Sequence, residues 1–409
     1  MKKTNTTKGK VDIMKKTLIL VGMLLLIGNY AIAKPLKVYI LVGQSNMEGH
    51  AQTRTFPAIA KDLKTADLYK DMVDAEGKPV ICEDVWIAYS YGDFSGNAVG
   101  KRSGKLTAGY GSQHHIGTGK IGPEFTFGIY MNKTLNEPVL LIKTAWGGKS
   151  LYVDFRPPSA SALPDAVKER RVKDAGVNYK LMIDYVKEVL TDPKSVCPAY
   201  DDKEGYELAG FVWFQGFNDM VAEPYPRADP SNKRNRTKNY SEYSTLLSCL
   251  IRDVRKDLNA PRMPFIIGVL GTGGPSTSES GIAFRKSMAA PAATKEFKGN
   301  VVNVFAEKYW PADVAAVLAK EAPFKNEIRK MEKELKAQKP SNADWRAGRE
   351  KIKADIRVKI EKVMTEDELF LLDKGVSNQG FHYYGSAKFE GQIGKAFAEA
   401  LLKLDQQTK

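Results

Sequence analysis

The chain has few cysteines and few histidines for its length. Its 409 residues include three cysteines, Cys82, Cys197 and Cys249, with no Cys-x-x-Cys spacing among them. An odd count allows at most one disulfide, which excludes a disulfide-dense scaffold, and the spacing does not predict a zinc site. We expect free structural thiols, no metal and no organic cofactor. The chain has four histidines, His50, His114, His115 and His382, and these are the candidate bases near neutral pH.

No long apolar run of the kind that crosses a membrane is found. Residues 18–27 form a short apolar run that follows two lysines and precedes Ala31-Ile32-Ala33. This pattern predicts a secretory signal peptide cleaved after Ala33, with Met14 as the start and residues 1–13 as an upstream extension. An uncleaved anchor is the alternative. We therefore expect a secreted or periplasmic protein without stable membrane insertion.

A basic stripe is also lacking, although the formal charge is +14. Residues 1–33 carry +5 of this charge, which leaves +9 after cleavage. Residues 311–365 hold 14 Lys/Arg and nine Asp/Glu, so most of the remaining surplus is interspersed with acids. Mixed charge of this kind is typical of solvated helices, and it does not indicate a nucleic-acid partner.

Short apolar runs alternate with longer helical patterns, which favours an α/β fold with a parallel sheet between two helical layers. The expected strands are residues 37–42, 83–89, 138–143, 208–214, 264–269 and 300–306. The expected helices are residues 124–134, 176–190, 240–257, 281–290 and 386–404. Residues 91–120 are rich in Gly, Ser and Thr and read as a long loop that contains His114-His115. Adjacent side chains point in different directions, so this pair indicates substrate contact or surface exposure rather than metal binding.

Residues 311–365 interrupt the alternation of strands and helices. Apolar residues recur there at three- and four-residue steps on both sides of a breaker at residues 339–342. We expect a charged helical hairpin inserted into one domain that consists of residues 34–310 and 366–409. Nothing in the sequence predicts an oligomeric state.

Ser45 is the best candidate nucleophile. It follows the apolar run 38–42 and Gly43, where the chain is expected to turn at the carboxyl end of a buried strand. The next helix would direct its N-terminal N–H groups at a negative charge formed there. A serine that simply caps a helix is the alternative reading.

Three other strand ends carry residues that suit ester hydrolysis. Thr144-Ala145-Trp146-Gly147-Gly148 and Gln215-Gly216-Phe217-Asn218-Asp219 each follow a predicted strand, and His382 precedes the final helix. Ester hydrolysis needs a nucleophile, a base and donors for an oxyanion, and these turns supply all three.

These motifs resemble the SGNH hydrolase superfamily, and within it the sialate O-acetylesterase and acetyl xylan esterase group. The similar blocks are GQSNM at 43–47, GPEF at 122–125, WGG at 146–148, WFQG at 213–216, GFND at 216–219 and His382. The resemblance implies a five-stranded parallel sheet in a three-layer α/β/α sandwich and an acetylated carbohydrate as substrate. It implies Ser45 as nucleophile, His382 as base, and Ser45, Gly148 and Asn218 as the oxyanion hole. Gln44, Asn46, Gln215, Trp146 and Glu124 are the candidate substrate-binding residues, and Trp213 and Trp310 are further candidates for stacking on a sugar.

The acid that usually orients the histidine is missing from both places where the group carries it. Gln379 stands three residues before His382, and Phe217 follows the WFQG glycine. Asp219 is the first substitute, Glu124 the second and a backbone carbonyl the third. The alternative role of Asp219 is a turn-stabilising carboxylate.

Two other functions stay open. One is a catalytically inactive carbohydrate-binding protein on the same fold, which the empty acid positions suggest. The other is a different acyl hydrolase, such as a lipase or thioesterase, although the chain has no long apolar lid segment.

Overall fold

A seven-stranded sheet forms the centre of the fold. The computed structural model describes residues 34–92, 98–113, 119–163, 169–232 and 237–408. In the order in which they lie across the sheet, the strands are β4 (Ala98–Lys105), β3 (Val85–Gly92), β6 (Val139–Ala145), β1 (Leu36–Gly43), β7 (Tyr206–Phe214), β8 (Phe265–Val269) and β9 (Val301–Phe305). A separate short pair joins β2 (Ala51–Gln52) to β5 (Lys120–Ile121).

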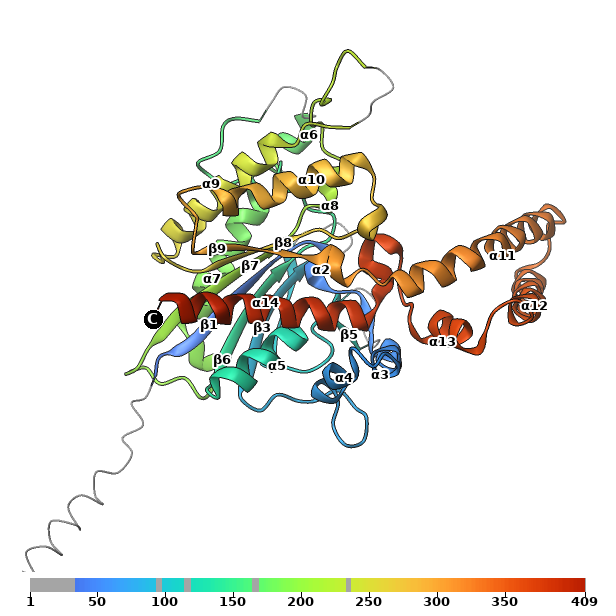
Figure 1. Cartoon of the computed structure of the whole chain (residues 1–409), viewed down its shortest axis with the longest axis horizontal. Helices are drawn as coiled ribbons and strands as arrows, with labels where there is room; N and C mark the ends of the chain where they lie inside the picture. Colours follow the sequence, from blue (N-terminus) through green and yellow to red (C-terminus); the bar gives the residue numbers. More distant parts are fainter. Residues whose placement is uncertain (1–33, 93–97, 114–118, 164–168, 233–236, 409) are drawn as a thin grey trace, which may run out of the picture.

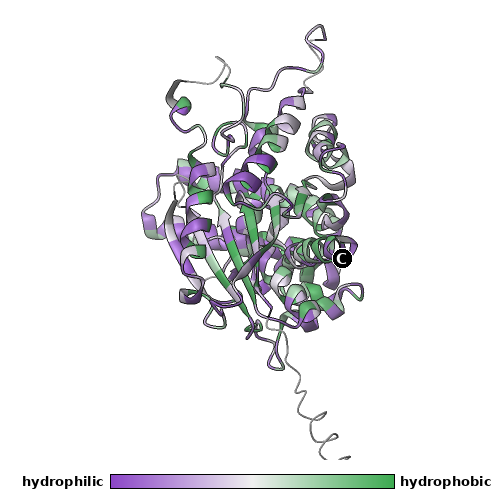
Figure 2. Cartoon of the chain, turned by 90° about the vertical axis from the view of Figure 1, so that its left-hand side faces the viewer, coloured by the Kyte–Doolittle hydropathy of each residue, from purple (hydrophilic) through white to green (hydrophobic). Residues whose placement is uncertain are grey.

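Strand β1 lies in the middle, between β6 and β7, and pairs with both in parallel. Its apolar residues are buried, as expected for a strand covered on both faces, and Figure 2 shows apolar strands in the interior of the molecule. Strands β3, β8 and β9 extend the parallel sheet on either side. All carboxyl ends of these parallel strands therefore lie at one edge, where the predicted motifs follow them.

Helices cover both faces of the sheet, because each parallel connection crosses over it. Helices α5 (Glu124–Leu135) and α14 (Ala387–Thr408) pack together on one face, and α7 (Val177–Thr191), α9 (Ser241–Asp257) and α10 (Glu279–Ala289) cover the other (Figure 1). The predicted α/β class with helices on both sides is confirmed. The shorter helices are α2 (Ser45–Glu48), α3 (Pro57–Lys61), α4 (Ala66–Met72), α6 (Glu169–Val172) and α8 (Phe217–Val221).

The expected five-stranded, all-parallel sheet is wrong in number and in one direction. Strand β4 pairs antiparallel with β3 at the edge of the sheet. It falls inside residues 91–120, which were expected to be loop. An edge strand has one neighbour and a half-solvated face, so its glycine- and lysine-rich sequence lacks the apolar run by which the central strands are recognised.

Three helices project from the sheet domain as an arm (Figure 1). Helices α11 (Ala312–Ala337) and α12 (Asn342–Glu361) contain the two predicted helical segments, with the break between them at residues 338–341. Helix α13 (Glu366–Lys374) was not predicted and packs against the same small core. That core consists of Val317, Ile352, Ile356, Ile360 and Met364. Arg54 links α13 to the domain by donating to the backbone oxygens of Asp373 and Val376.

Cys82, Cys197 and Cys249 are free thiols, as expected. Within the described ranges, no helix combines the length and apolar character that crossing a membrane requires. The predicted signal peptide (residues 1–33) and the His114-His115 pair lie outside the described residues.

Candidate active site

Ser45 occupies a sharp turn at the carboxyl end of the central strand. Strand β1 ends at Gly43, Gln44 is extended, and Ser45 begins the single turn of α2. A side chain at Gly43 would place its Cβ only 2.2 Å from the backbone oxygen of Phe214, so glycine is required where β1 and β7 end together. Ser45 is buried at the edge of the sheet, with 8% of its surface exposed.

The two turns that were predicted to supply oxyanion donors lie on either side of Ser45. Gly43 is in register with Ala145 of β6 and with Phe214 of β7. The turns that follow these strands, residues 146–148 and 215–218, therefore flank the nucleophile turn. Trp146 N donates to the oxygen of Gly43 over 3.2 Å, which fixes the first of them to β1.

Gln44 fixes the orientation of the Asn218 amide. Its Oε1 accepts from the backbone N–H groups of Gly216 and Asn218, over 3.2 and 3.3 Å, so this atom is the oxygen. Its Nε2 therefore donates to Oδ1 of Asn218 over 2.8 Å. The amide group of Asn218 is thus left with Nδ2 as a donor that has no hydrogen-bond partner within the described ranges. This arrangement is suited to the predicted role of Asn218 in an oxyanion hole.

Gly148 has the backbone freedom that its predicted role needs. It is exposed, it has a φ of +73°, and no atom lies within 4 Å of the place where a Cβ would stand. Among the described residues, neither Ser45 N–H nor Gly148 N–H has a hydrogen-bond partner. Both groups therefore stay available to an oxyanion beside Ser45.

Asp219 does not orient His382, which corrects the first substitute for the missing acid. Its carboxylate accepts from the backbone N–H groups of Leu151 and Tyr152, over 2.8 and 2.9 Å. It also accepts from Nε2 of Gln215 and from the Tyr225 hydroxyl. Asp219 is fully buried, and this burial raises its pKa to about 7 in spite of the four donors. The carboxylate ties the segment after Gly148 to the turn that contains Asn218, so it holds the two candidate oxyanion donors in place.

His382 lies in a strained turn just before α14. Tyr383 and Tyr384 both have positive φ, 49° and 61°, which is unfavourable for side chains of this size. The buried ring of Tyr383 stabilises the turn because it stacks on Phe389 at 3.6 Å and its hydroxyl accepts from Gly271 N. Nδ1 of His382 lies 3.0 Å from Oδ1 of Asn378, so an amide stands where an acid was expected.

Two ring contacts place His382 at the same edge of the sheet as Ser45. Its imidazole stacks on His50, just after α2, with a centroid separation of 3.9 Å. Its neighbour Phe381 packs on Phe217, which precedes Asn218. Within the described chain no hydrogen bond joins His382 to Ser45; catalytic hydrogen bonds often form only when substrate binds. Burial, His50 and Lys120 together lower the pKa of His382 far below 6.5, so its imidazole is neutral.

Four of the predicted substrate-binding residues are buried inside the protein, which corrects those predictions. Gln44 and Gln215 are fully buried, and their amides bond to other parts of the chain. Trp146 is also fully buried and packs on Phe155. Glu124 is buried in an ion pair with Lys143, so it orients no histidine either.

Asn46 and the two further tryptophans have different surroundings. Asn46 is 1% exposed, and neither amide atom has a partner among the described residues. Trp213 belongs to the core, and Trp310 is half-buried against Tyr383 and Tyr384. None of the three is therefore an exposed platform for a sugar ring.

The sequence did not point to Asn378 and His50 as parts of the site. Asn378 stands four residues before His382, one position from the expected acid, and its side chain is neutral. His50 lies five residues after Ser45, and only the fold shows that it stacks on a histidine more than 300 residues away. The one feature of the sequence that could have indicated His50 is the small number of histidines, because His50 is one of four.

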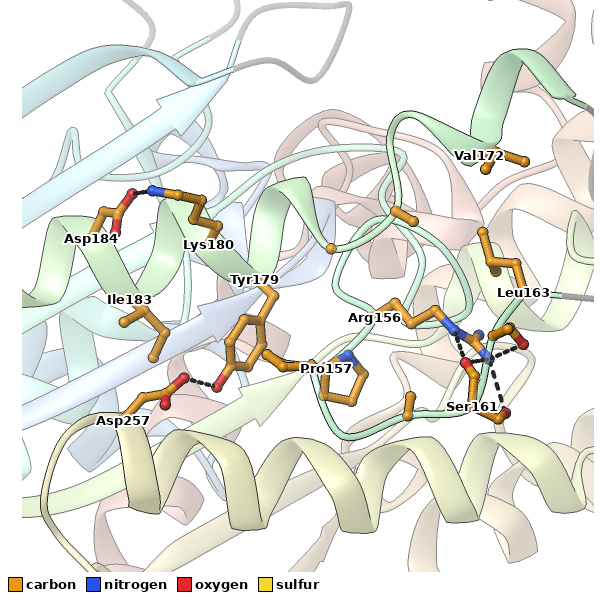
Figure 3. A pocket seen from close by; sticks show the side chains of 15 residues that line it. Arg156, Pro157, Ser161, Leu163, Val172, Tyr179, Lys180, Ile183, Asp184 and Asp257 are labelled. Carbon is orange, nitrogen blue, oxygen red and sulfur yellow. Dashed lines mark hydrogen bonds and ion pairs between the residues drawn. The ribbon is translucent and has the colours of Figure 1, made fainter.

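A cavity lies elsewhere in the molecule, separate from this site. It has a volume of about 1030 Å³ and lies between residues 156–163, α7 and the end of α9 (Figure 3). Tyr179 donates to Asp257 across one end of it. None of the candidate site residues lines it. In the part of the chain that the structure describes, no three His, Cys, Asp or Glu residues come together as a possible metal site.

Two solved structures and one family model are similar to this chain. A protein from Arabidopsis thaliana aligns over 90% of this chain and 98% of its own, with 14% identity and a TM-score of 0.43. A carbohydrate acetylesterase from Xanthomonas citri aligns over 66% of this chain and 49% of its own, with 13% identity and a TM-score of 0.37. No curated protein matches the sequence. The model of the carbohydrate esterases described as sialic acid-specific acetylesterases matches residues 35–308, and the chain belongs to this family.

Proposed function

We propose that this protein is a serine esterase that hydrolyses O-acetyl esters on carbohydrates, as a sialate O-acetylesterase or an acetyl xylan esterase does. The observation that carries the proposal is the grouping of Ser45, Gly148, Asn218 and His382 at one edge of the sheet, around the carboxyl end of β1. The substrate is an acetylated carbohydrate. The predicted signal peptide supports action outside the cytoplasm, in the periplasm or after secretion.

In the proposed mechanism, Oγ of Ser45 attacks the acetyl carbonyl and Nε2 of His382 takes the hydroxyl proton. The N–H groups of Ser45 and Gly148 and Nδ2 of Asn218 stabilise the oxyanion of the tetrahedral intermediate. The intermediate then expels the sugar oxygen, which receives the proton from His382. Water, which gives a proton to His382, then attacks the acetyl-enzyme and forms a second tetrahedral intermediate. The bond between Oγ of Ser45 and the acetyl carbon breaks, Oγ receives the proton from His382, and acetate is released.

The amide partner of His382 is compatible with this mechanism. In serine proteases, replacing the triad aspartate by asparagine costs roughly 10⁴-fold in kcat because the histidine takes the wrong tautomer. Here Oδ1 of Asn378 also accepts from Gln379 N over 2.7 Å, and a backbone N–H can only donate. The oxygen therefore faces His382, whose Nδ1 carries the hydrogen, and Nε2 is free to act as the base.

Acetate release tests the proposal. We expect the protein to release acetate from O-acetylated sialic acid or acetylated xylan, and from a chromogenic acetate ester, and Ser45 to react with a fluorophosphonate. Ser45→Ala should lose both activities. A wild-type protein that releases acetate no faster than Ser45→Ala would contradict the proposal.

The second candidate function is an inactive carbohydrate-binding protein. The observation that favours it is the absence, among the described residues, of a carboxylate bonded to Nδ1 of His382, together with the low pKa of this imidazole. Micromolar binding of an acetylated glycan without fluorophosphonate labelling of Ser45 would support this function over the esterase.

A further inference from the structure

We propose that Glu48 and His50 are positioning residues for the imidazole of His382, acting through the side-chain amide of Asn378. A buried carboxylate at the far end of a chain of polar groups would then serve the base in place of a directly bonded acid. The inference rests on the proposed roles of Ser45 and His382.

The donor and acceptor roles of these polar groups follow from one backbone donor, although the contact between His50 and Glu48 is a charge contact and not a hydrogen bond. Because Gln379 N–H donates to Oδ1 of Asn378, the other atom of that amide is Nδ2, which can only donate. Nδ2 lies 3.4 Å from Nδ1 of His50, so this ring nitrogen accepts. The hydrogen of a neutral His50 is then on Nε2, which lies 3.5 Å from Oε2 of Glu48. The polar groups are thus ordered from Glu48 through His50 and Asn378 to His382.

The fold confines the side chains of Glu48, His50 and His382. Glu48 is 2% exposed, and its Oε1 accepts from Gly147 N over 3.1 Å. The rings of His50 and His382 are parallel within 2°. Ser377 connects the two segments that carry them, because its hydroxyl accepts from Gln52 N and lies 3.2 Å from the oxygen of His50. A side chain this confined loses little further entropy when it orients its neighbour.

The charges around His382 give Glu48 a function during catalysis. When His382 accepts the proton from Ser45, an imidazolium forms against the face of His50. The positive charge of Lys120 repels this imidazolium and so disfavours its formation. Glu48 offsets this charge through the polarised imidazole of His50 and the amide of Asn378. Two further carboxylates are buried nearby and are not part of the relay, by which we mean Glu48, His50 and Asn378. Glu390 accepts from the backbone of His50, and Glu124 pairs with Lys143.

The test compares the same substitutions in two backgrounds, the wild-type protein and Asn378→Asp. In Asn378→Asp a carboxylate bonds directly to His382. This carboxylate orients the imidazole by itself, so Glu48 and His50 are no longer needed for that purpose. Glu48→Gln keeps an acceptor for Gly147 N but removes the charge, and His50→Phe keeps the stacked ring but removes both nitrogens. We expect each to lower kcat on a chromogenic acetate ester by about 10-fold in the wild type and by less than about 2-fold in Asn378→Asp, with KM unchanged.

Equal losses in both backgrounds would overturn the inference, because they would show that Glu48 and His50 only support the fold. A second measurement separates this failure from failure of the esterase proposal. With four histidines in the chain, ¹⁵N NMR can identify the His382 tautomer without any activity. We expect hydrogen on Nδ1 in the wild type and a shift toward Nε2 in Glu48→Gln. Hydrogen on Nε2 in the wild type would refute the relay even if the protein is an active esterase.

Discussion

Nε2 of Gln44 donates to Oδ1 of Asn218 over 2.8 Å, across the two turns that follow neighbouring strands. Gln44 precedes the candidate nucleophile directly and is fully buried, so its side chain makes no contact with solvent or substrate. Its contribution is to fix which atom of the Asn218 amide is an acceptor for Gln44 and which is left as a donor. A residue that was expected to bind substrate instead orients a candidate oxyanion donor.

Gln44→Glu tests this relationship with a change of one atom. The glutamate still accepts from the N–H groups of Gly216 and Asn218, but its second oxygen cannot donate to Asn218. The Asn218 amide is then expected to turn its NH₂ group toward the glutamate and lose its place beside the oxyanion. We predict a loss of kcat of about 10²- to 10³-fold, as for removal of an oxyanion donor.

Steady-state kinetics on a chromogenic acetate ester would measure this effect. Asn218→Ala is the matched control, and the double variant should be no slower than either single variant because all three lack the same donor. Additive losses in the double variant would contradict the assigned role of Gln44.

The pH dependence of kcat/KM should reflect the unusual surroundings of His382. Burial, reinforced by His50 and Lys120, lowers the pKa of its imidazole far below 6.5. A base acts in its neutral form, which persists at all pH values above the pKa in the folded protein. Acidification through pH 6.5 should therefore not remove the base, and we expect the titration of His382 itself to change kcat/KM by less than about 2-fold between about pH 8 and pH 5.

An acid limb of the pH profile near pH 7 would instead come from Asp219, whose pKa burial raises to about 7. Asp219→Asn distinguishes the two groups. A limb that disappears in this variant belongs to the carboxylate that ties the two turns together. A limb near pH 6.5 that persists in Asp219→Asn would show that His382 titrates normally and would refute the prediction.

Most of the fold could be predicted because its central strands are buried on both faces. Continuous apolar runs such as residues 38–42 are rare outside such strands, and the parallel connections then require helices on both sides. Strand β4 was not predicted because it is an edge strand that pairs only with β3, and such a strand tolerates glycine and lysine. Helix α13 was not predicted because it is short and packs on the arm, away from the main core.

For the site, the sequence could predict which turns lie together, because the ends of paired strands determine where these turns lie. Register places the turns after β1, β6 and β7 together, so the grouping of Ser45, Gly148 and Asn218 at one edge follows from it. The roles predicted for these residues come from the family resemblance and remain predictions. The direction of a loop side chain does not follow from register. Asp219 turns toward Leu151 and Tyr152, and Trp146 turns into the core, although both belong to the predicted turns. The stacking of His50 on His382 joins residues far apart in the sequence and could not be predicted from it.

Two glycines of the site should respond differently to alanine. Gly43→Ala brings a Cβ to 2.2 Å from the backbone oxygen of Phe214, so β1 and β7 must separate at their carboxyl ends. Gly148→Ala meets no atom within 4 Å and is opposed only by its φ of +73°, at a cost of about 1 kcal/mol. We predict that Gly43→Ala unfolds at much lower temperature, whereas Gly148→Ala stays folded and loses activity as its N–H moves.

Thermal unfolding followed by circular dichroism, with acetate release measured on the same samples, would check both variants. A Gly148→Ala protein with wild-type kcat would argue against Gly148 N–H as an oxyanion donor. Wild-type stability of Gly43→Ala would contradict the close approach of the two strands.

Lys143 should be essential for stability because it is a fully buried cation with three acceptors. It donates to Oε2 of Glu124 and to the backbone oxygens of Glu48 and Tyr110, over 2.6 to 2.9 Å. Lys143→Met leaves the carboxylate of Glu124 buried without its cation, and such losses cost about 3–5 kcal/mol. It also frees the backbone oxygen at the end of α2, so the turn that carries Ser45 should loosen and kcat should fall.

Urea unfolding would measure the change in the free energy of unfolding. Lys180→Met is the matched control, because Lys180 pairs with Asp184 on an exposed face of α7 and its loss should cost less than about 1 kcal/mol. Lys143→Met/Glu124→Leu removes both buried charges and should recover most of the stability, yet kcat should stay low because the oxygen of Glu48 still lacks its donor. Recovery of kcat together with stability would show that Lys143 affects Ser45 only through the fold as a whole.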